Sequence, residues 1–244
     1  MIKKMLLSVV VAFVAMTTAY ACFDTYLFLN KRSMVYPERH FIMDTLSEYS
    51  FNNMRSPAED TFFMDFNAYY GVTKRFSIQV GAASAEITRD ELLKIDEYGL
   101  KGVYNIVKMK EKSYYLDTIL ACRSSVGGDV AFEISAPNIF YKGDNVFVLH
   151  PVIELPKNSP AIIGGHCGIF HTFKDVALIG IGAEYASAQS GSTFNKRLVK
   201  GEAATSLFFG ARLGNIFYFQ NEFAKGLANS RDFGFAATLK IFVK

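Results

Sequence analysis

The stretch TFFMDFNAYYGVTKRFSIQVGAASAE, residues 61 to 86, alternates between apolar and polar or small side chains on both sides of a short polar turn. The turn is Thr73-Lys74-Arg75. Period-two alternation is typical of a β-strand with one apolar face, so the stretch predicts a β-hairpin. The apolar face comprises Phe62, Met64, Phe66, Ala68, Tyr70, Phe76, Ile78, Val80 and Ala82.

The same alternation recurs to the end of the chain and predicts twelve strands. An even number is expected when both ends of a bacterial barrel lie in the periplasm, and ten or fourteen strands are the alternatives. Links 53–60, 87–96 and 187–201 are longer than the turns with which they partly alternate, as in membrane barrels. The predicted strands are residues 41–52, 61–71, 76–86, 97–109, 113–123, 129–140, 145–155, 161–172, 176–186, 202–213, 216–226 and 233–244.

The face opposite the apolar one distinguishes a soluble β-protein from a membrane barrel. A soluble sandwich or lipocalin-like barrel would present many Lys, Glu and Asp side chains outward, but charged residues make up only 20% of the chain. The polar face is instead rich in small residues, as at Gly180, Gly182 and Ala186. Many segments have 10 to 12 residues, close to the length that crosses a bilayer at a tilt. The sequence therefore predicts an all-β fold, an antiparallel transmembrane β-barrel.

The predicted lipid-facing positions carry few polar side chains. Lys108, His171 and Lys225 lie near strand ends, where they can reach the membrane interface. Asn221 lies in the middle of a strand, where a local bulge is the one explanation the pattern offers.

Residues 1–21 have the three-part pattern of a secretory signal peptide. Two lysines precede an apolar run at 5–16, and Ala19-Tyr20-Ala21 forms an A-x-A cleavage site. The run is shorter than the roughly 20 residues of a membrane-spanning helix. We therefore expect export and an outer-membrane location. The predicted organisation is a signal peptide at 1–21, a periplasmic or lumenal segment at 22–40 and an outer-membrane barrel at 41–244.

The three cysteines are not expected to form a disulfide. Cys122 and Cys167 lie three strand spacings apart, about 14 Å, which exceeds the Cα separation that a disulfide allows. Cys22 would begin the mature chain, and the bulky Tyr20 favours ordinary cleavage over acylation as a lipoprotein.

The hairpin YYGVTKRFSIQVGAAS, residues 69 to 84, resembles a pattern of bacterial outer-membrane proteins. In that pattern an aromatic-Gly-apolar-Thr-x-Arg-Phe turn links two lipid-facing strands. With the signal peptide and the last strand, DFGFAATLKIFVK, the chain resembles a porin-like or transporter-like barrel of a Gram-negative bacterium. The resemblance implies outer-membrane lipid and the outer-membrane insertion machinery as partners. Such barrels usually end in an aromatic residue, whereas this chain ends in Lys244.

No pattern predicts catalysis, a metal or a cofactor. Barrel hydrolases of this membrane carry a His with a Ser two residues later on one strand, but Gly168 follows His166 and Phe173 follows His171. The histidines also lack the spacing of a dedicated metal site. A net charge of +3 without a basic cluster excludes nucleic acid as a partner.

The lumenal face is where the sequence places function. Its acids outnumber its bases, and rings of carboxylates favour cations. The candidate lumen-lining residues are Asp65, Lys101, Asp117, Arg123, Glu133, His150, Glu154, His166, Glu184, Glu202, Arg212, Glu222 and Lys240.

Three functions follow from this pattern. The first is a small channel or transporter for small polar or cationic solutes. The second is a non-conducting structural or surface-interaction barrel, and the third a lipid-modifying barrel enzyme. Residues 22–40 precede the first strand and have the length to fold into the lumen as a plug. Neither the solute, the oligomeric state nor the organism follows from the sequence.

Overall fold

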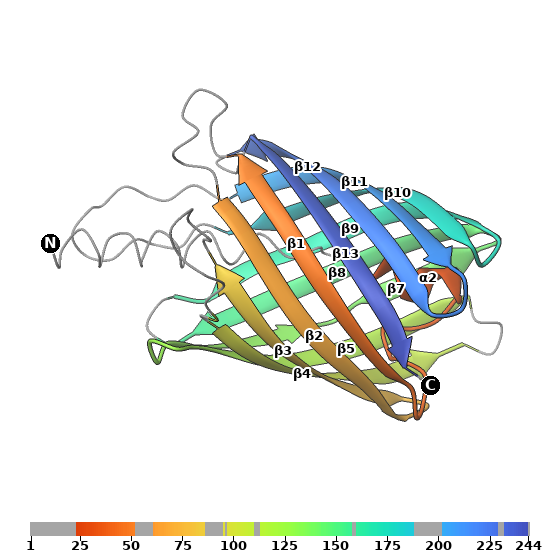
Figure 1. Ribbon diagram of the computed structural model, residues 1–244, viewed down its shortest axis with the longest axis horizontal. Coiled ribbons are helices and arrows are strands. Elements are labelled where there is room, and N and C mark those ends of the chain that lie inside the picture. The colour runs from red at the N-terminus through yellow and green to blue at the C-terminus, as the bar shows by residue number, and fades with distance from the viewer. Residues whose placement is uncertain are drawn as a thin grey trace, which may run out of the picture.

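The chain forms a closed β-barrel (Figure 1). The computed structural model describes residues 23–51, 61–85, 95, 97–109, 113–157, 160–187, 202–228 and 232–243. Within them lie one short helix, α2 (Thr25–Leu29), and thirteen strands. The strands are β1 (Phe41–Phe51), β2 (Thr61–Thr73), β3 (Phe76–Ala85), β4 (Glu97–Lys108), β5 (Tyr114–Ser125), β6 (Val130–Ser135), β7 (Asn138–Lys142), β8 (Asn145–Pro156), β9 (Ile162–Phe173), β10 (Ala177–Ala186), β11 (Glu202–Leu213), β12 (Phe217–Ala228) and β13 (Phe233–Val243).

Neighbouring strands are antiparallel, and the ring closes where β13 pairs with β1. β6 and β7 both pair with β5 on one side and with β8 on the other, so the two occupy one position in a twelve-strand barrel. The predicted strand 129–140 is thus divided at Ala136-Pro137, while its register continues. Proline has no N–H for the ladder, which accounts for the interruption. The prediction of an antiparallel barrel of twelve strands is confirmed.

The two ends of the barrel differ in their connections. The turn end holds the turns at 74–75, 143–144, 174–176 and 214–216, the start of β1 and the end of β13. At the opposite end, the loop end, the strands lead into the predicted longer links. These links lie outside the described residues, except for Ile95 and Ser187.

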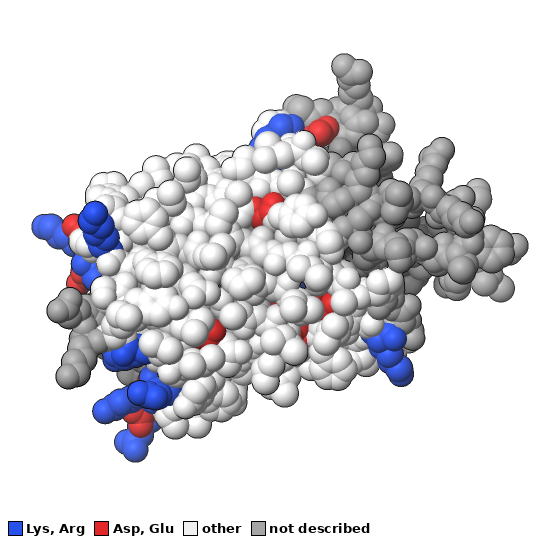
Figure 2. Space-filling view, turned by 180° about the vertical axis from the view of Figure 1, so that it is seen from behind, with Lys and Arg blue, Asp and Glu red and all other residues white. Residues whose placement is uncertain are grey.

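The outer surface between the two ends is apolar. Leu120, Phe132 and Ile163 point outward and are 58%, 52% and 61% exposed. Figure 2 shows Lys and Arg gathered at the two ends of the barrel, with a largely white surface between them. Such a band matches the lipid-facing belt of outer-membrane barrels. In the part of the chain that the structure describes, no helix is long and apolar enough to cross a bilayer.

Asn221 and two cysteines are the unusual residues on the predicted lipid face. Asn221 pairs in an unbroken register with Phe209 on one side and Ala237 on the other, so the suggestion of a bulge there is wrong. The bulge in the ladder of β11 and β12 lies at 203–204. Cys122 and Cys167 are free thiols on β5 and β9.

Residues 23–40 lie at the turn end, where Figure 1 shows α2, and the buried side chains from Phe23 to Tyr36 fill the inside of the barrel there. The last part of this segment rests on β2, since Glu38 forms an isolated parallel bridge with Gly71. A Cβ on Gly71 would lie 1.8 Å from the Pro37 carbonyl oxygen. Residue 71 therefore has to be glycine for this segment to approach the wall.

Replacing Gly71 with Ala should push the Pro37 carbonyl away from β2. We expect the unfolding free energy to fall by about 1–3 kcal/mol, the usual cost of overpacking. Urea unfolding of the barrel refolded in detergent micelles measures this change. Gly99→Ala is the matched control, because the nearest atom to its added Cβ is 3.8 Å away. Equal stability of the two variants would contradict a close contact between the segment and β2.

Candidate functional site in the barrel lumen

The lumen has two parts. At the turn end it is filled by residues 23–36, called the plug below, which share an apolar cluster with inward residues of β1, β4, β5 and β7 to β12. Toward the loop end lies a cavity of about 270 Å³. Phe23, Leu27 and Met34 of the plug line this cavity. The plug thus forms the floor of the cavity.

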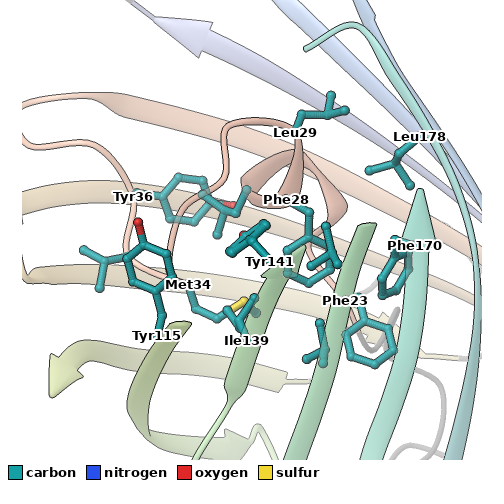
Figure 3. Close-up of a cluster of buried hydrophobic side chains, with 14 of the residues drawn as sticks. Phe23, Phe28, Leu29, Met34, Tyr36, Tyr115, Ile139, Tyr141, Phe170 and Leu178 are labelled. Atoms are coloured by element: carbon teal, nitrogen blue, oxygen red, sulfur yellow. The ribbon is translucent and has the colours of Figure 1, made fainter. Parts of the chain in front are cut away.

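Two phenylalanines anchor the plug in the apolar cluster (Figure 3). The Phe23 ring packs edge-on against Phe170 and Phe208, with centroids 5.1 and 5.7 Å away. The Phe28 ring lies 5.0 Å from Phe170. A Cβ on Gly182 would come within 3.1 Å of Phe23 and 2.9 Å of Phe208. The small residues of the lumenal face therefore provide the space that the plug fills.

Hydrogen bonds tie the plug to several strands. The Thr25 hydroxyl donates to the Gln220 amide oxygen at 2.5 Å and lies 2.6 Å from the Tyr218 hydroxyl. The Met34 N–H donates to the Asp117 carboxylate at 2.6 Å. All these groups are buried, where an unpaired polar group is costly. The plug is consequently held in one position and does not merely occupy space.

A buried lysine joins the plug to the two terminal strands. Lys240 on β13 is 3% exposed, lies 3.3 Å from the Asp24 carboxylate of the plug and donates to Asp44 on β1. The Tyr36 hydroxyl donates to Asp24 and accepts from Lys240 at 3.1 Å. Burial, and then the charge of Asp24, raises the pKa of Tyr36 well above its usual value, so the phenol stays protonated as a donor. These four residues form what we call the latch.

The cavity wall is strongly charged, with an excess of acids. Arg123 lies 3.2 Å from Glu154 and 4.0 Å from both Glu97 and Glu133. Seven carboxylates line the cavity against three basic side chains. The acids are Asp24, Asp44, Asp65, Glu97, Glu133, Glu154 and Glu184, and the bases are Lys101, Arg123 and Lys240.

Two histidines and a glutamate form a row on neighbouring strands. His150 on β8 is directly opposite His166 on β9, which is directly opposite Glu184 on β10. The His150 Nε2 atom lies 2.9 Å from the Ser135 hydroxyl, which also donates to Glu133 at 3.3 Å. The Nδ1 atoms of both histidines are buried without a hydrogen-bond partner among the described residues.

The structure places the predicted lumen-lining residues in different settings. Asp117 and Arg212 contact the plug through Met34 and Asn30, and Glu222 is buried on β12 outside the cavity. The side chain of Glu202 lies outside the described part of the structure. The predicted residues that do line the cavity are Asp65, Lys101, Arg123, Glu133, His150, Glu154, His166, Glu184 and Lys240.

Sequence reasoning missed several contributors to this site, among them Glu97 in the cavity wall. Asp24 and Tyr36 belong to the plug, and no periodic pattern shows which strands a plug contacts. Ser135 meets His150 across two strands, whereas the sequence search considered a serine and a histidine on one strand. The inward parity of Ser135 was the available signal.

Comparison with known proteins identifies the fold. No protein-family model and no curated protein matches the sequence. The fold is similar to an outer-membrane channel from Pseudomonas putida F1, with a TM-score of 0.68 at 8% identity over 86% of this chain and 97% of that chain. The KdgM porin gives 0.60 at 10% identity over 83% and 99% of the two chains. The NanC porin gives 0.62 at 6% identity over 82% and 98%. The structural neighbours are therefore outer-membrane β-barrel channels.

Replacing Lys240 with Met should loosen the plug, because Asp24 and Asp44 would remain buried without their cation. Breaking a buried pair in this way costs about 3–5 kcal/mol, and we expect a loss of that order with faster proteolysis within residues 23–40. Urea unfolding and limited proteolysis of the refolded barrel measure the two effects.

Lys225→Met is the control for the latch variant. Lys225 pairs with Asp232 at 3.9 Å, and both side chains are nearly half exposed, so its loss should cost no more than about 1 kcal/mol. Adding Asp24→Asn to Lys240→Met should restore part of the stability. Equal losses in the two lysine variants would contradict the latch.

Proposed function

We propose that the protein is a plugged outer-membrane channel for small polar or cationic solutes, in which residues 23–36 close the lumen. The observation that carries the proposal is the charged cavity above the plug. A barrel with only a structural role could fill this space with apolar side chains, whereas here ten ionisable carboxylate and basic groups line it. An acid-rich lumen favours cations over anions.

The structural neighbours support a channel but differ in what they handle. One KdgM porin structure holds disordered oligogalacturonate, an acidic ligand, in a barrel of similar fold. The carboxylate excess of the present cavity is poorly suited to such an anion. The fold is thus shared, while the charge of the lumen argues for a different solute.

The plug is built in a way that allows its release. Residues 23–36 are joined to the wall through side-chain contacts and not through strand pairing. The isolated bridge of Glu38 to Gly71 follows the plug in the chain. Departure of the plug would therefore leave the backbone ladder of the barrel intact. The closed state described here would become an open one without breaking the ring.

A non-conducting barrel is the second candidate, and the plug itself favours it. Aromatic packing, buried hydrogen bonds and the latch together hold the lumen shut at the turn end.

The enzyme alternative has less support. Ser135 and His150 are within hydrogen-bond distance, but Ser135 is only 3% exposed and the His150 Nδ1 atom has no orienting acid among the described residues.

The outer-membrane location extends the proposal to the parts of the chain around the barrel. Residues 1–21 would direct export and be removed, and the outer-membrane insertion machinery would place the barrel in lipid. This assignment is supported by the signal-peptide pattern and by the apolar belt of the barrel.

Planar-bilayer recording tests the channel. The full chain should show rare, small steps, and the double variant Phe23→Ala/Phe28→Ala should show frequent cation-selective steps because the aromatic anchors of the plug are gone. Neutralising Glu133→Gln and Glu184→Gln in that variant should lower the preference for cations. Phe132→Ala/Phe147→Ala, which removes two outward rings, is the matched control.

If the full chain and the plug variant are both folded and fully inserted but show no conductance, the channel proposal is contradicted and the non-conducting candidate is favoured. Circular dichroism and heat-modifiable migration in gels establish that each variant is folded.

A further inference from the structure

The cavity contains an acceptor that lacks a donor. Ser135 has one hydroxyl hydrogen, which it donates to Glu133, so it can only accept from His150. His150 therefore carries its proton on Nε2, and its Nδ1 presents a lone pair. That atom is buried without a hydrogen-bond partner among the described residues, on a side chain that is 7% exposed and lines the cavity.

The row of side chains that begins with His150 on β8 continues through His166 on β9 to Glu184 on β10. His166 also has a buried Nδ1 without a hydrogen-bond partner in the described part of the chain, and this atom is 3.8 Å from a Glu184 oxygen, too far for a hydrogen bond. The rings of His150 and His166 are 5.5 Å apart. A ligand that donates several hydrogen bonds and carries positive charge, such as an ammonium group, complements this wall.

The cavity also contains a cation that forms no direct ion pair with a carboxylate of the described residues. Lys101 on β4 lines the cavity, and no carboxylate of the described residues lies within 4.0 Å of its ammonium group. Its charge is within electrostatic range of the Asp65 carboxylate and of both imidazoles. Arg123, by contrast, is surrounded by three glutamates. A ligand carboxylate would find its partner at Lys101.

We propose that the cavity binds a small zwitterion, whose ammonium group donates to His150, His166 and Glu184 and whose carboxylate pairs with Lys101. This inference rests on the proposed function and names its solute class. A cavity of about 270 Å³ lies just below the range of typical ligand pockets and suits a molecule of amino-acid size. Among the described residues, no group of three or more His, Cys, Asp or Glu is arranged to hold a metal ion.

Three related probes separate the two halves of the ligand. Alanine carries both charges, propionate lacks the ammonium group and ethylamine lacks the carboxylate. Saturation-transfer NMR titrations of the full chain, refolded in detergent micelles, measure each dissociation constant without requiring conduction. We expect alanine to bind at least about tenfold more tightly than either partial probe, because each partial probe lacks one charged group that forms hydrogen bonds.

Matched variants assign each half of the site. His150→Phe should weaken alanine binding about tenfold or more and leave the weak binding of propionate unchanged. Lys101→Met should weaken alanine in the same way and leave ethylamine unchanged. The controls are His171→Phe and Lys108→Met, which alter exposed residues of β9 and β4. Circular dichroism establishes that each variant is folded.

The outcomes distinguish this inference from the channel itself. Ethylamine binding as tightly as alanine would overturn the zwitterion, and so would equal effects of a cavity variant and its control. Conduction without alanine binding would contradict the zwitterion site but leave the proposed channel function standing. Alanine binding by a barrel that never conducts would support the zwitterion site and contradict the proposed channel function.

Discussion

The structure depends on closure of the backbone ladder between β1 and β13. In hydrocarbon, an open strand edge would leave N–H and C=O groups without partners, and each would cost several kcal/mol. The eleven paired positions from Phe41 with Val243 to Phe51 with Phe233 remove that edge. Because closure fixes the parity of every strand, it also decides that apolar side chains meet lipid and that charged ones share the lumen.

The lumen therefore concentrates groups that cannot face lipid, and it accommodates them in two ways. At the turn end the glycines of β9 and β10 admit aromatic rings, and buried polar groups are paired with the plug. Toward the loop end the charges surround a space, and only some of them are paired. This division follows from which residues face the plug. The Asp117 carboxylate accepts a hydrogen bond from Met34, while the His150 Nδ1 atom has no partner within the described ranges.

The sequence was sufficient for the architecture because a period of two runs through most of each strand, despite local register shifts such as that at 203–204. The register also continues across Pro137, whose carbonyl accepts from the Asp117 N–H. The sequence was insufficient for the site. The contact of Ser135 with His150 depends on the stagger between strands, and the contact of Asp24 with Lys240 joins residues far apart in the chain. Parity places a side chain inside a barrel but does not give its depth or its partner.

The position of the latch links the plug to the assembly of the wall. Asp44 and Lys240 are direct partners in the register of β1 and β13, the first and last strands of the barrel. The lysine that holds Asp24 therefore lies in the seam where the ring closes. A seam that forms without Asp24 in place contains a buried lysine with one carboxylate fewer to neutralise it. The strand pairing that closes the wall thus also positions the lysine that holds the plug.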